Sequence, residues 1–147
     1  MNLTTTYPRS VKEKLAGYVH LGRMIDKCRS VLAKTQGEYV YPCPMDQRLL
    51  EFAGMTADQF LRAVEERPND EAVVEWFLKT APPHGEADID AWNAMMLSLG
   101  PDTEDKWSYF TTIRDAVAPH RADIMTWADL LDLEERRPVP NRGGVHR

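Results

Sequence analysis

The sequence predicts an all-α fold, a single-domain irregular bundle of about six or seven helices. Apolar residues recur at three- and four-residue spacing in one segment after another, and no segment shows the sustained alternation of a strand. Glycines, prolines and capping residues separate these segments at short intervals. The 147 residues are 43% hydrophobic and 28% charged, so the chain is long enough and apolar enough to bury a core.

The N-terminal part predicts an arm followed by a long helix. Residues 1–9 are polar and are expected to lie as an arm on the body of the domain. Ser10 opens the capping-box pattern Ser-Val-Lys-Glu, so a helix is expected to start directly after it. Gly17 weakens that helix and predicts a kink, or a short turn before a longer helix over 18–34. Gly37 is expected to end the helix. The apolar stripe of this helix is Leu21, Met24, Ile25, Cys28, Val31 and Leu32.

A proline-rich stretch follows, and we call residues 39–48 the ribbon. Each proline fixes its own φ and pushes the residue before it toward extended geometry. Tyr41 and Cys43 both precede prolines, so they are expected on a stiff segment. Pro44 suits the first position of a helix, and Asp46 then lies in the first turn, where the helix dipole favours a carboxylate.

The remaining helices are predicted from their start and stop signals. The expected starts are at Pro44, Thr56 with Gln59 as a capping box, Asn69 or Asp70, Asp88, Thr103, and near 124–126. The expected ends are at Gly54, Pro68, the loop 81–85, Gly100, Pro119 and Glu135. Residues 1–136 are therefore expected to form one helical domain, and the Pro-, Gly- and Arg-rich residues 137–147 a flexible tail.

Composition excludes several classes of function. The net charge of −5 disfavours nucleic-acid binding, which needs clustered Lys and Arg. No apolar run approaches a membrane span and the first residues have no apolar signal core, so we expect no membrane partner and a cytoplasmic location. Two cysteines without a Cys-x-x-Cys pair fit a reducing compartment, although a disulfide between Cys28 and Cys43 stays open. No phosphate-binding glycine loop is present, and no cofactor is predicted.

The spacing of His20, Met24 and Cys28 is that of three side chains on one side of a helix, and a soft metal could use such ligands. Met24 and Cys28, however, lie within the apolar stripe, where packing in the core is the more frequent role. No other metal-ligand spacing occurs, so the sequence predicts no metal site.

Cys43 with His20 is the candidate catalytic pair. A thiol just before a helix N-terminus has a lowered pKa, and a histidine could act as its base, with Asp26 orienting the ring. The alternative is a buried, inert thiol, which is the more common role of a free cysteine. Whether the chain is an enzyme therefore stays open.

Arg23, Asp26 and Lys27 of the helix 18–34 are expected to face the ribbon across a cleft, where opposite charges and the phenol of Tyr41 converge. Such a cleft would bind a small polar or anionic ligand. The candidate ligand-binding residues are Arg23, Asp26, Tyr41, Asp46 and Arg48. Arg23→Ala and Asp46→Ala are then expected to leave melting nearly intact and to abolish ligand binding. The alternative function is a non-catalytic interaction module that docks a partner through an aromatic helix face.

Four strings of the sequence together resemble a family of small bacterial proteins that is catalogued as a domain of unknown function. They are YPRS at 7–10, GYVHLGRMIDKCR at 17–29, YPCPMDQ at 41–47 and DIDAWN at 88–93. The resemblance spans most of the chain up to Glu135 and implies a compact bacterial domain. It implies no reaction, and no functional residue is carried over from it.

Overall fold

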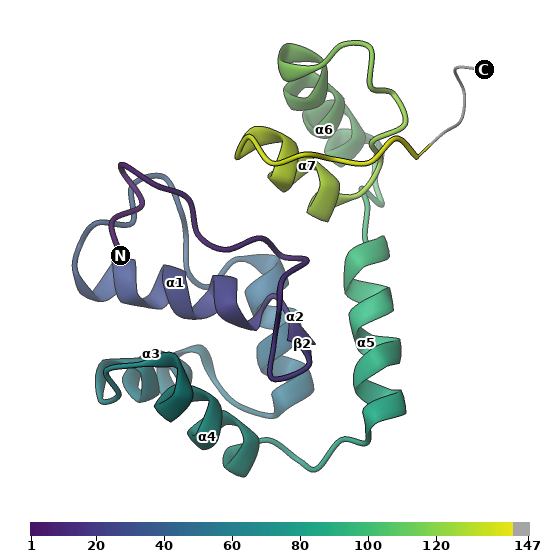
Figure 1. Ribbon diagram of the computed structural model, residues 1–147. Coiled ribbons are helices and arrows are strands. Elements are labelled where there is room, and N and C mark those ends of the chain that lie inside the picture. Colours follow the sequence, from purple (N-terminus) through teal and green to yellow (C-terminus); the bar gives the residue numbers. More distant parts are fainter. Residues whose placement is uncertain (143–147) are drawn as a thin grey trace. The chain divides into compact units, whose positions relative to one another are not determined.

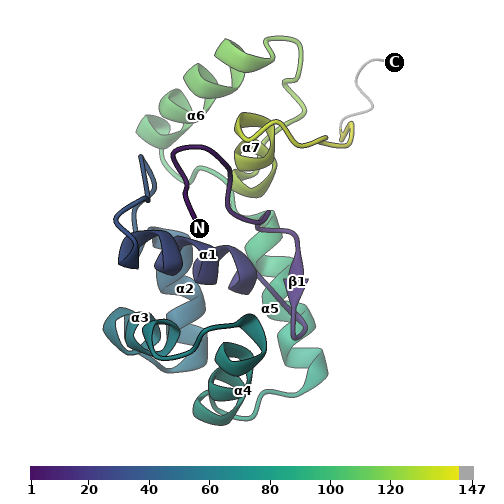
Figure 2. The same ribbon diagram turned by 60° about the vertical axis from the view of Figure 1, so that its left-hand side comes forward.

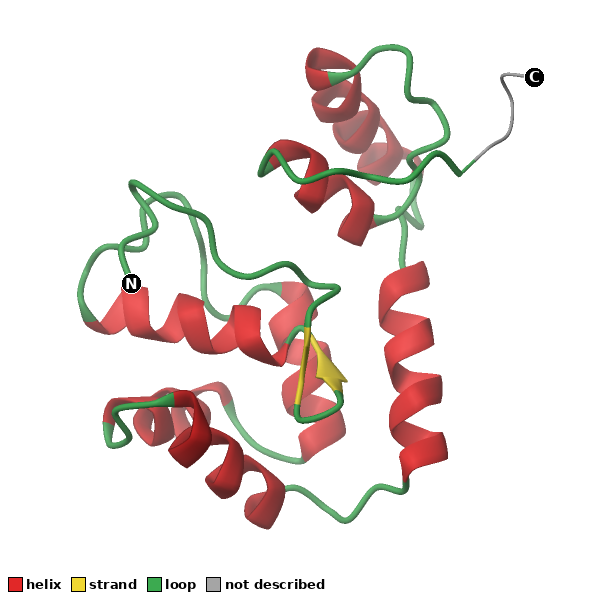
Figure 3. Cartoon of the chain, viewed as in Figure 1, coloured by secondary structure: helices red, strands yellow, loops and turns green. Residues whose placement is uncertain are grey.

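A computed structural model describes residues 1–142 of the chain, which form seven helices and one small pair of strands (Figures 1 and 3). The predicted all-α fold with about six or seven helices is therefore confirmed. The chain divides into two compact units, residues 1–93 and the residues from 94 onward, which we describe in turn. The single domain predicted over residues 1–136 stays a prediction.

The first unit is built around α1. Its elements are β1 (Lys14–Leu15), β2 (Tyr18–Val19), α1 (Leu21–Leu32), α2 (Pro44–Ala53), α3 (Ala57–Glu65), α4 (Asp70–Thr80) and the larger part of α5 (Glu86–Ser98). The fully buried side chains of its core include Leu21, Met24, Ile25, Cys28, Leu49, Phe60 and Phe77. Tyr18 meets the ring of Phe77 edge-on at 5.2 Å, which ties the strand pair to α4.

The predicted caps of this unit form as the local sequence requires. Thr56 accepts a hydrogen bond from the Gln59 backbone, and the Gln59 side chain accepts one from the Thr56 backbone, which completes the capping box. Asn69 caps α4 by accepting from the Ala72 backbone at 2.9 Å. Gly54 ends α2 with a φ of 67°, in the left-handed region that glycine enters readily.

The helix predicted directly after Ser10 is wrong, and so is the expectation of no strand. Residues 14–19 instead form an antiparallel hairpin in which Lys14 pairs with Val19 and Leu15 with Tyr18 (Figure 2). Ala16 and Gly17 make its two-residue loop with φ values of 53° and 87°. Positive φ at both loop residues is the turn geometry that matches strand twist, and it breaks any helix passing through them.

The hairpin loop yields a prediction about stability. Ala16 is exposed and holds a left-handed conformation that disfavours residues with a Cβ, whereas asparagine before glycine favours this turn. Ala16→Asn should therefore raise the free energy of unfolding by about 0.5–1 kcal/mol, measured by urea denaturation. Glu13→Asn, also exposed but outside the loop, should change it by less than about 0.5 kcal/mol. Equal effects of both changes would contradict the turn assignment.

The helix expected over 18–34 is α1, which is shorter at both ends. It begins at Leu21 because His20 has a φ of 70°, outside the helical region. It ends at Leu32, and Lys34 with a φ of 58° reverses the chain, so the predicted end at Gly37 is wrong. Gly37 itself has a φ of 59° in the turn that follows.

The second unit contains the end of α5, α6 (Glu104–Val117) and α7 (Trp127–Glu134). Thr103 and Thr126 cap the two later helices, accepting from Lys106 and Asp129 backbones as their positions predict. The core of this unit is a buried cluster with partly buried apolar residues packed against it. Its members are Phe110, Ile124 and Leu130, with Ile113, Trp127, Leu133 and Val139 around them.

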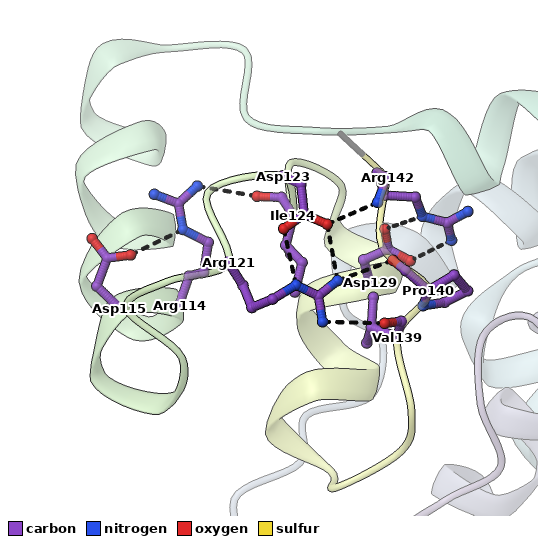
Figure 4. Close-up of polar contacts among 9 residues, drawn as sticks. All are labelled: Arg114, Asp115, Arg121, Asp123, Ile124, Asp129, Val139, Pro140 and Arg142. Carbon is purple, nitrogen blue, oxygen red and sulfur yellow. Dashed lines mark hydrogen bonds and ion pairs between the residues drawn. The ribbon is translucent and has the colours of Figure 1, made fainter. Parts of the chain in front are cut away.

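Residues 137–142 are bonded to this second unit, which differs from the flexible tail predicted there. Arg142 donates two hydrogen bonds to the buried carboxylate of Asp129, at 3.0 and 2.9 Å, and its backbone N–H donates to Asp123 (Figure 4). Arg121 donates to the same Asp123 and to the carbonyl oxygen of Val139. The part of the predicted tail at 143–147 lies outside the described residues.

Candidate functional site

Asp46 is the centre of the polar cluster between α1 and the ribbon. Cys43 is the N-cap of α2 and Pro44 its first residue, so Asp46 falls at the third position of the helix. Its carboxylate is fully buried and accepts from the Cys43 backbone N–H at 2.9 Å. One oxygen lies 2.6 Å from Nε2 of His20, and the other lies 2.6 Å from Nζ of Lys27. The ribbon and α1 are thus joined through one buried carboxylate.

The electrostatics of this cluster favour an ionised Asp46 and a neutral His20. Burial by itself raises the pKa of Asp46. The hydrogen bond from His20, the positive charge of Lys27 and the Cys43 N–H outweigh that effect and hold this pKa well below its usual range. Burial lowers the pKa of His20 from its ordinary 6.5 by more than Asp46 raises it. The neutral imidazole therefore carries its proton on Nε2, which donates to Asp46.

The second ring nitrogen of His20 has no hydrogen-bond partner among the described residues. The side chain is 1% exposed, so Nδ1 is a bare, buried acceptor. His20 also holds its left-handed φ of 70° as the N-cap of α1, and its side chain forms no capping bond. An unsatisfied buried acceptor and a strained backbone at one residue are both unfavourable for stability, and such features gather at functional sites.

Arg23 and Asp26 are both buried, and both are hydrogen-bonded to Arg9 in the arm (residues 1–9). Asp26 accepts from the backbone and the side chain of Arg9, at 2.8 and 3.0 Å. Arg23 donates to the carbonyl oxygen of Arg9 at 3.2 Å, and its guanidinium lies 5.7 Å from the ring centroid of Tyr39 in the ribbon. Arg23 therefore contacts both the ribbon and the arm, and Asp26 contacts the arm.

Tyr41 connects the ribbon to two helices of the core. Its hydroxyl donates to the Ala57 carbonyl oxygen at 2.7 Å, at the start of α3. The thiol of Cys28 in α1 is hydrogen-bonded to the same hydroxyl. Burial is the main cause that raises the pKa of both groups, so each keeps its proton at neutral pH. Tyr41 thus joins the ribbon to α1 and α3.

Two of the predicted residues have a different place from the one expected. Arg48 is exposed on α2, and no contact among the described residues joins it to the other candidates. Cys43 is half-buried and Cys28 is buried, and both are free thiols. No hydrogen bond in the described part of the chain joins the Cys43 side chain to His20. The acid that orients the His20 ring is Asp46, not Asp26 as predicted.

Lys27 was expected to face the ribbon with Arg23 and Asp26 but was not named as a ligand-binding candidate, and Arg9 and Asn93 were not expected near the site. Lys27 lies seven positions after His20, a spacing that returns to the same side of a helix, and this signal was available in the sequence. Arg9 had no signal, because it lies outside any periodic segment. Asn93 accepts from the Val19 backbone at 3.1 Å and donates to the Gly17 carbonyl oxygen at 2.8 Å, which holds the hairpin that precedes His20.

A separate hollow lies on the α3–α4 side of the first unit. It has a volume of about 240 Å³ and is lined by Arg67, Ala72, Glu75, Trp76 and Lys79. The guanidinium of Arg67 lies 5.6 Å from the Trp76 ring centroid, and Lys79 pairs with Glu75. None of the predicted site residues lines this hollow.

Comparison with known proteins places the chain in a family. None of the described helices has the length and apolarity needed to cross a membrane. No curated protein matches the sequence. The model of the family described as "Domain of unknown function (DUF5069)" matches residues 5–137, which include every candidate residue of the α1–ribbon cluster. The resemblance noted in the sequence is thereby confirmed, and the chain belongs to the DUF5069 family.

Proposed function

We propose that the cluster between α1 and the ribbon binds a small polar ligand, and that Nδ1 of His20 accepts a hydrogen bond from it. The observation that supports this is the bare Nδ1 of a ring that is 1% exposed. A buried acceptor without a partner is unfavourable, so it is retained most readily where a ligand satisfies it. The ligand then carries a hydroxyl or N–H group at the position that faces this nitrogen.

The charges around His20 narrow the ligand class further. Lys27 is already neutralised by Asp46 at 2.6 Å, so it offers little attraction to a second anion. Arg23 is a better candidate than Lys27 for binding an anionic group. It lies in the first turn of α1, next to His20, and its guanidinium faces Tyr39 of the ribbon. A hydroxy acid combines a donor for Nδ1 with a carboxylate for Arg23, and it is the compound class we would test first.

A thermal-shift screen of hydroxy acids, polyols and small amines tests this function. A ligand should raise the melting temperature of the wild-type chain and of Arg48→Ala, whose side chain is exposed away from the cluster. It should not raise that of His20→Gln. Glutamine can place an N–H donor near the position of Nε2, but its amide oxygen is attached to the same carbon and does not occupy the position of Nδ1. A compound that shifts His20→Gln as much as the wild type would overturn the assignment to His20.

The alternative function, a protein-interaction module, has one observation in its favour. Tyr109 and Val117 on α6 are 63% and 53% exposed, while Ile113 between them packs on the core of the second unit. Exposed apolar side chains are common at protein contacts. This alternative predicts that no polar compound shifts the melting temperature in a manner that depends on His20.

A further inference from the structure

The arm lies against the turn of α1 that carries the proposed site, and Figures 1 and 2 show it running alongside this helix. The Arg9 backbone N–H donates to Asp26, and the Arg9 carbonyl oxygen accepts from Arg23. Two residues further on, the Val11 carbonyl oxygen accepts from the backbone N–H of His20 at 2.9 Å. The end of the arm is therefore bonded to Arg23 and Asp26, and the residue that follows it two positions later is bonded to the backbone of His20.

The Arg9 side chain links the arm to two helices. Its Nε and Nη2 atoms donate to the Asp26 carboxylate at 3.1 and 3.0 Å, and its Nη1 donates to Asp70 at the start of α4 at 2.8 Å. Gly22 makes room for this guanidinium, because a Cβ on that residue would lie 3.0 Å from Nε. The Asp70 end is the more accessible one: its side chain is 39% exposed, against 6% for Asp26.

The rest of the arm is anchored near its two ends: Pro8 is buried beside Arg9, and the Met1 carbonyl oxygen accepts from the Thr35 hydroxyl at 2.7 Å. Leu3 is 6% exposed, and its backbone N–H donates to the Thr35 carbonyl oxygen at 2.8 Å. The stretch 4–7 between these two anchors is exposed. Segments with few buried contacts open locally at a lower free-energy cost than the core around them. The arm can thus separate from α1 while the helices stay folded.

We propose that the arm is a removable cover of the α1–ribbon site and that the ion pair between Arg9 and Asp70 is its latch. The ligand that would enter rests on the proposed function. The opening itself can be measured without any ligand, because His20 is chemically reactive when it is reached. Diethyl pyrocarbonate acylates neutral imidazole nitrogens, and Nδ1 of His20 is bare.

The experiment compares the rates of acylation of His20 in the wild type, Asp70→Asn and Glu71→Gln, read by peptide mass spectrometry. Glu71 is the matched control, because it is a neighbouring acid in the same first turn of α4 without a contact to Arg9 among the described interactions. We expect Asp70→Asn to raise the His20 rate by roughly fivefold. We expect Glu71→Gln to leave it unchanged, with the rate at the exposed His120 and the melting temperature equal in all three chains.

Two readouts separate cover opening from general loosening. Amide hydrogen exchange at Leu3 and Arg9 should accelerate in Asp70→Asn, because these N–H groups hold the arm to the rest of the unit, through Thr35 and Asp26 respectively. An unchanged rate of His20 acylation in Asp70→Asn would overturn the proposal. A rise in that rate would also overturn it if the His84 rate rose as well and the melting temperature fell. If Asp70→Asn raises the rate of His20 acylation but no compound binds the chain, the cover is retained and the proposed function is rejected. If a ligand binds with the same association rate to the wild type and to Asp70→Asn, the proposed function is retained and the cover is rejected.

Discussion

Asp46→Ala should destabilise the first unit by about 3–5 kcal/mol, because it leaves the buried charge of Lys27 without a counter-ion. The backbone N–H of Cys43 and Nε2–H of His20 lose their acceptor in the same change. Urea denaturation followed by circular dichroism measures the effect. The sequence predicted that this substitution leaves melting nearly intact; the fully buried carboxylate with three donors leads to the opposite expectation.

Matched variants identify the cause of that loss. Arg48→Ala, an exposed change on the same helix, should alter the free energy of unfolding by less than about 0.5 kcal/mol. The double change Asp46→Asn with Lys27→Met should be less destabilising than Asp46→Ala, because it leaves no uncompensated charge in the cluster. An Asp46→Ala chain as stable as the wild type would mean that water reaches this carboxylate and its partners.

Acid should destabilise the chain from about pH 6.5 downward, before ordinary carboxylates titrate. Burial holds the pKa of His20 below its ordinary 6.5 in the folded state, against the opposing effect of Asp46 and with the help of Arg23 and Lys27. The unfolded chain then binds a proton that the folded chain does not, so stability present above pH 6.5 is lost as the pH falls. While folded His20 stays neutral, the loss is about 1.4 kcal/mol per pH unit.

Asp46 adds to the acid sensitivity in a lower window. Its folded pKa is held below the ordinary 3.8, so its contribution is present above pH 3.8 and is lost below it. Urea denaturation at successive pH values measures both windows. His20→Gln should flatten the dependence directly below about pH 6.5 and leave the lower window. A wild-type chain of constant stability across the upper window would show that His20 is protonated in the folded state.

Local sequence predicted the helices well because their signals act between near neighbours. The Thr56–Gln59 capping box and the Asn69 cap need residues three positions apart, and both form as expected. The left-handed turn at Gly54 follows from one residue type. The helix expected after Ser10 does not form, because β1 and β2 pair around the Ala16–Gly17 loop, whose positive φ values break a helix.

The candidate site was predicted in part. Placing Asp46 in the first turn of α2 follows from the two prolines of the ribbon, and that position is the one observed. Its partners could not be predicted, since His20 lies 26 positions earlier in the chain and the distance between them depends on how α1 packs on α2. Arg48 looked equivalent to Asp46 in the sequence, but two positions along a helix turn a side chain by about 200°, so Asp46 is buried and Arg48 is exposed.

By itself the sequence determined the helical class, most helix starts and the stiff segment before α2, because each of these depends on interactions within a few residues. Tertiary structure alone decided which charges meet. Asp26 and Asp70 are 17 and 61 positions from Arg9, yet one guanidinium binds both. Burial then sets the properties of the groups it brings together: it leaves Nδ1 of His20 bare and keeps Asp46 ionised, and neither follows from the residue types.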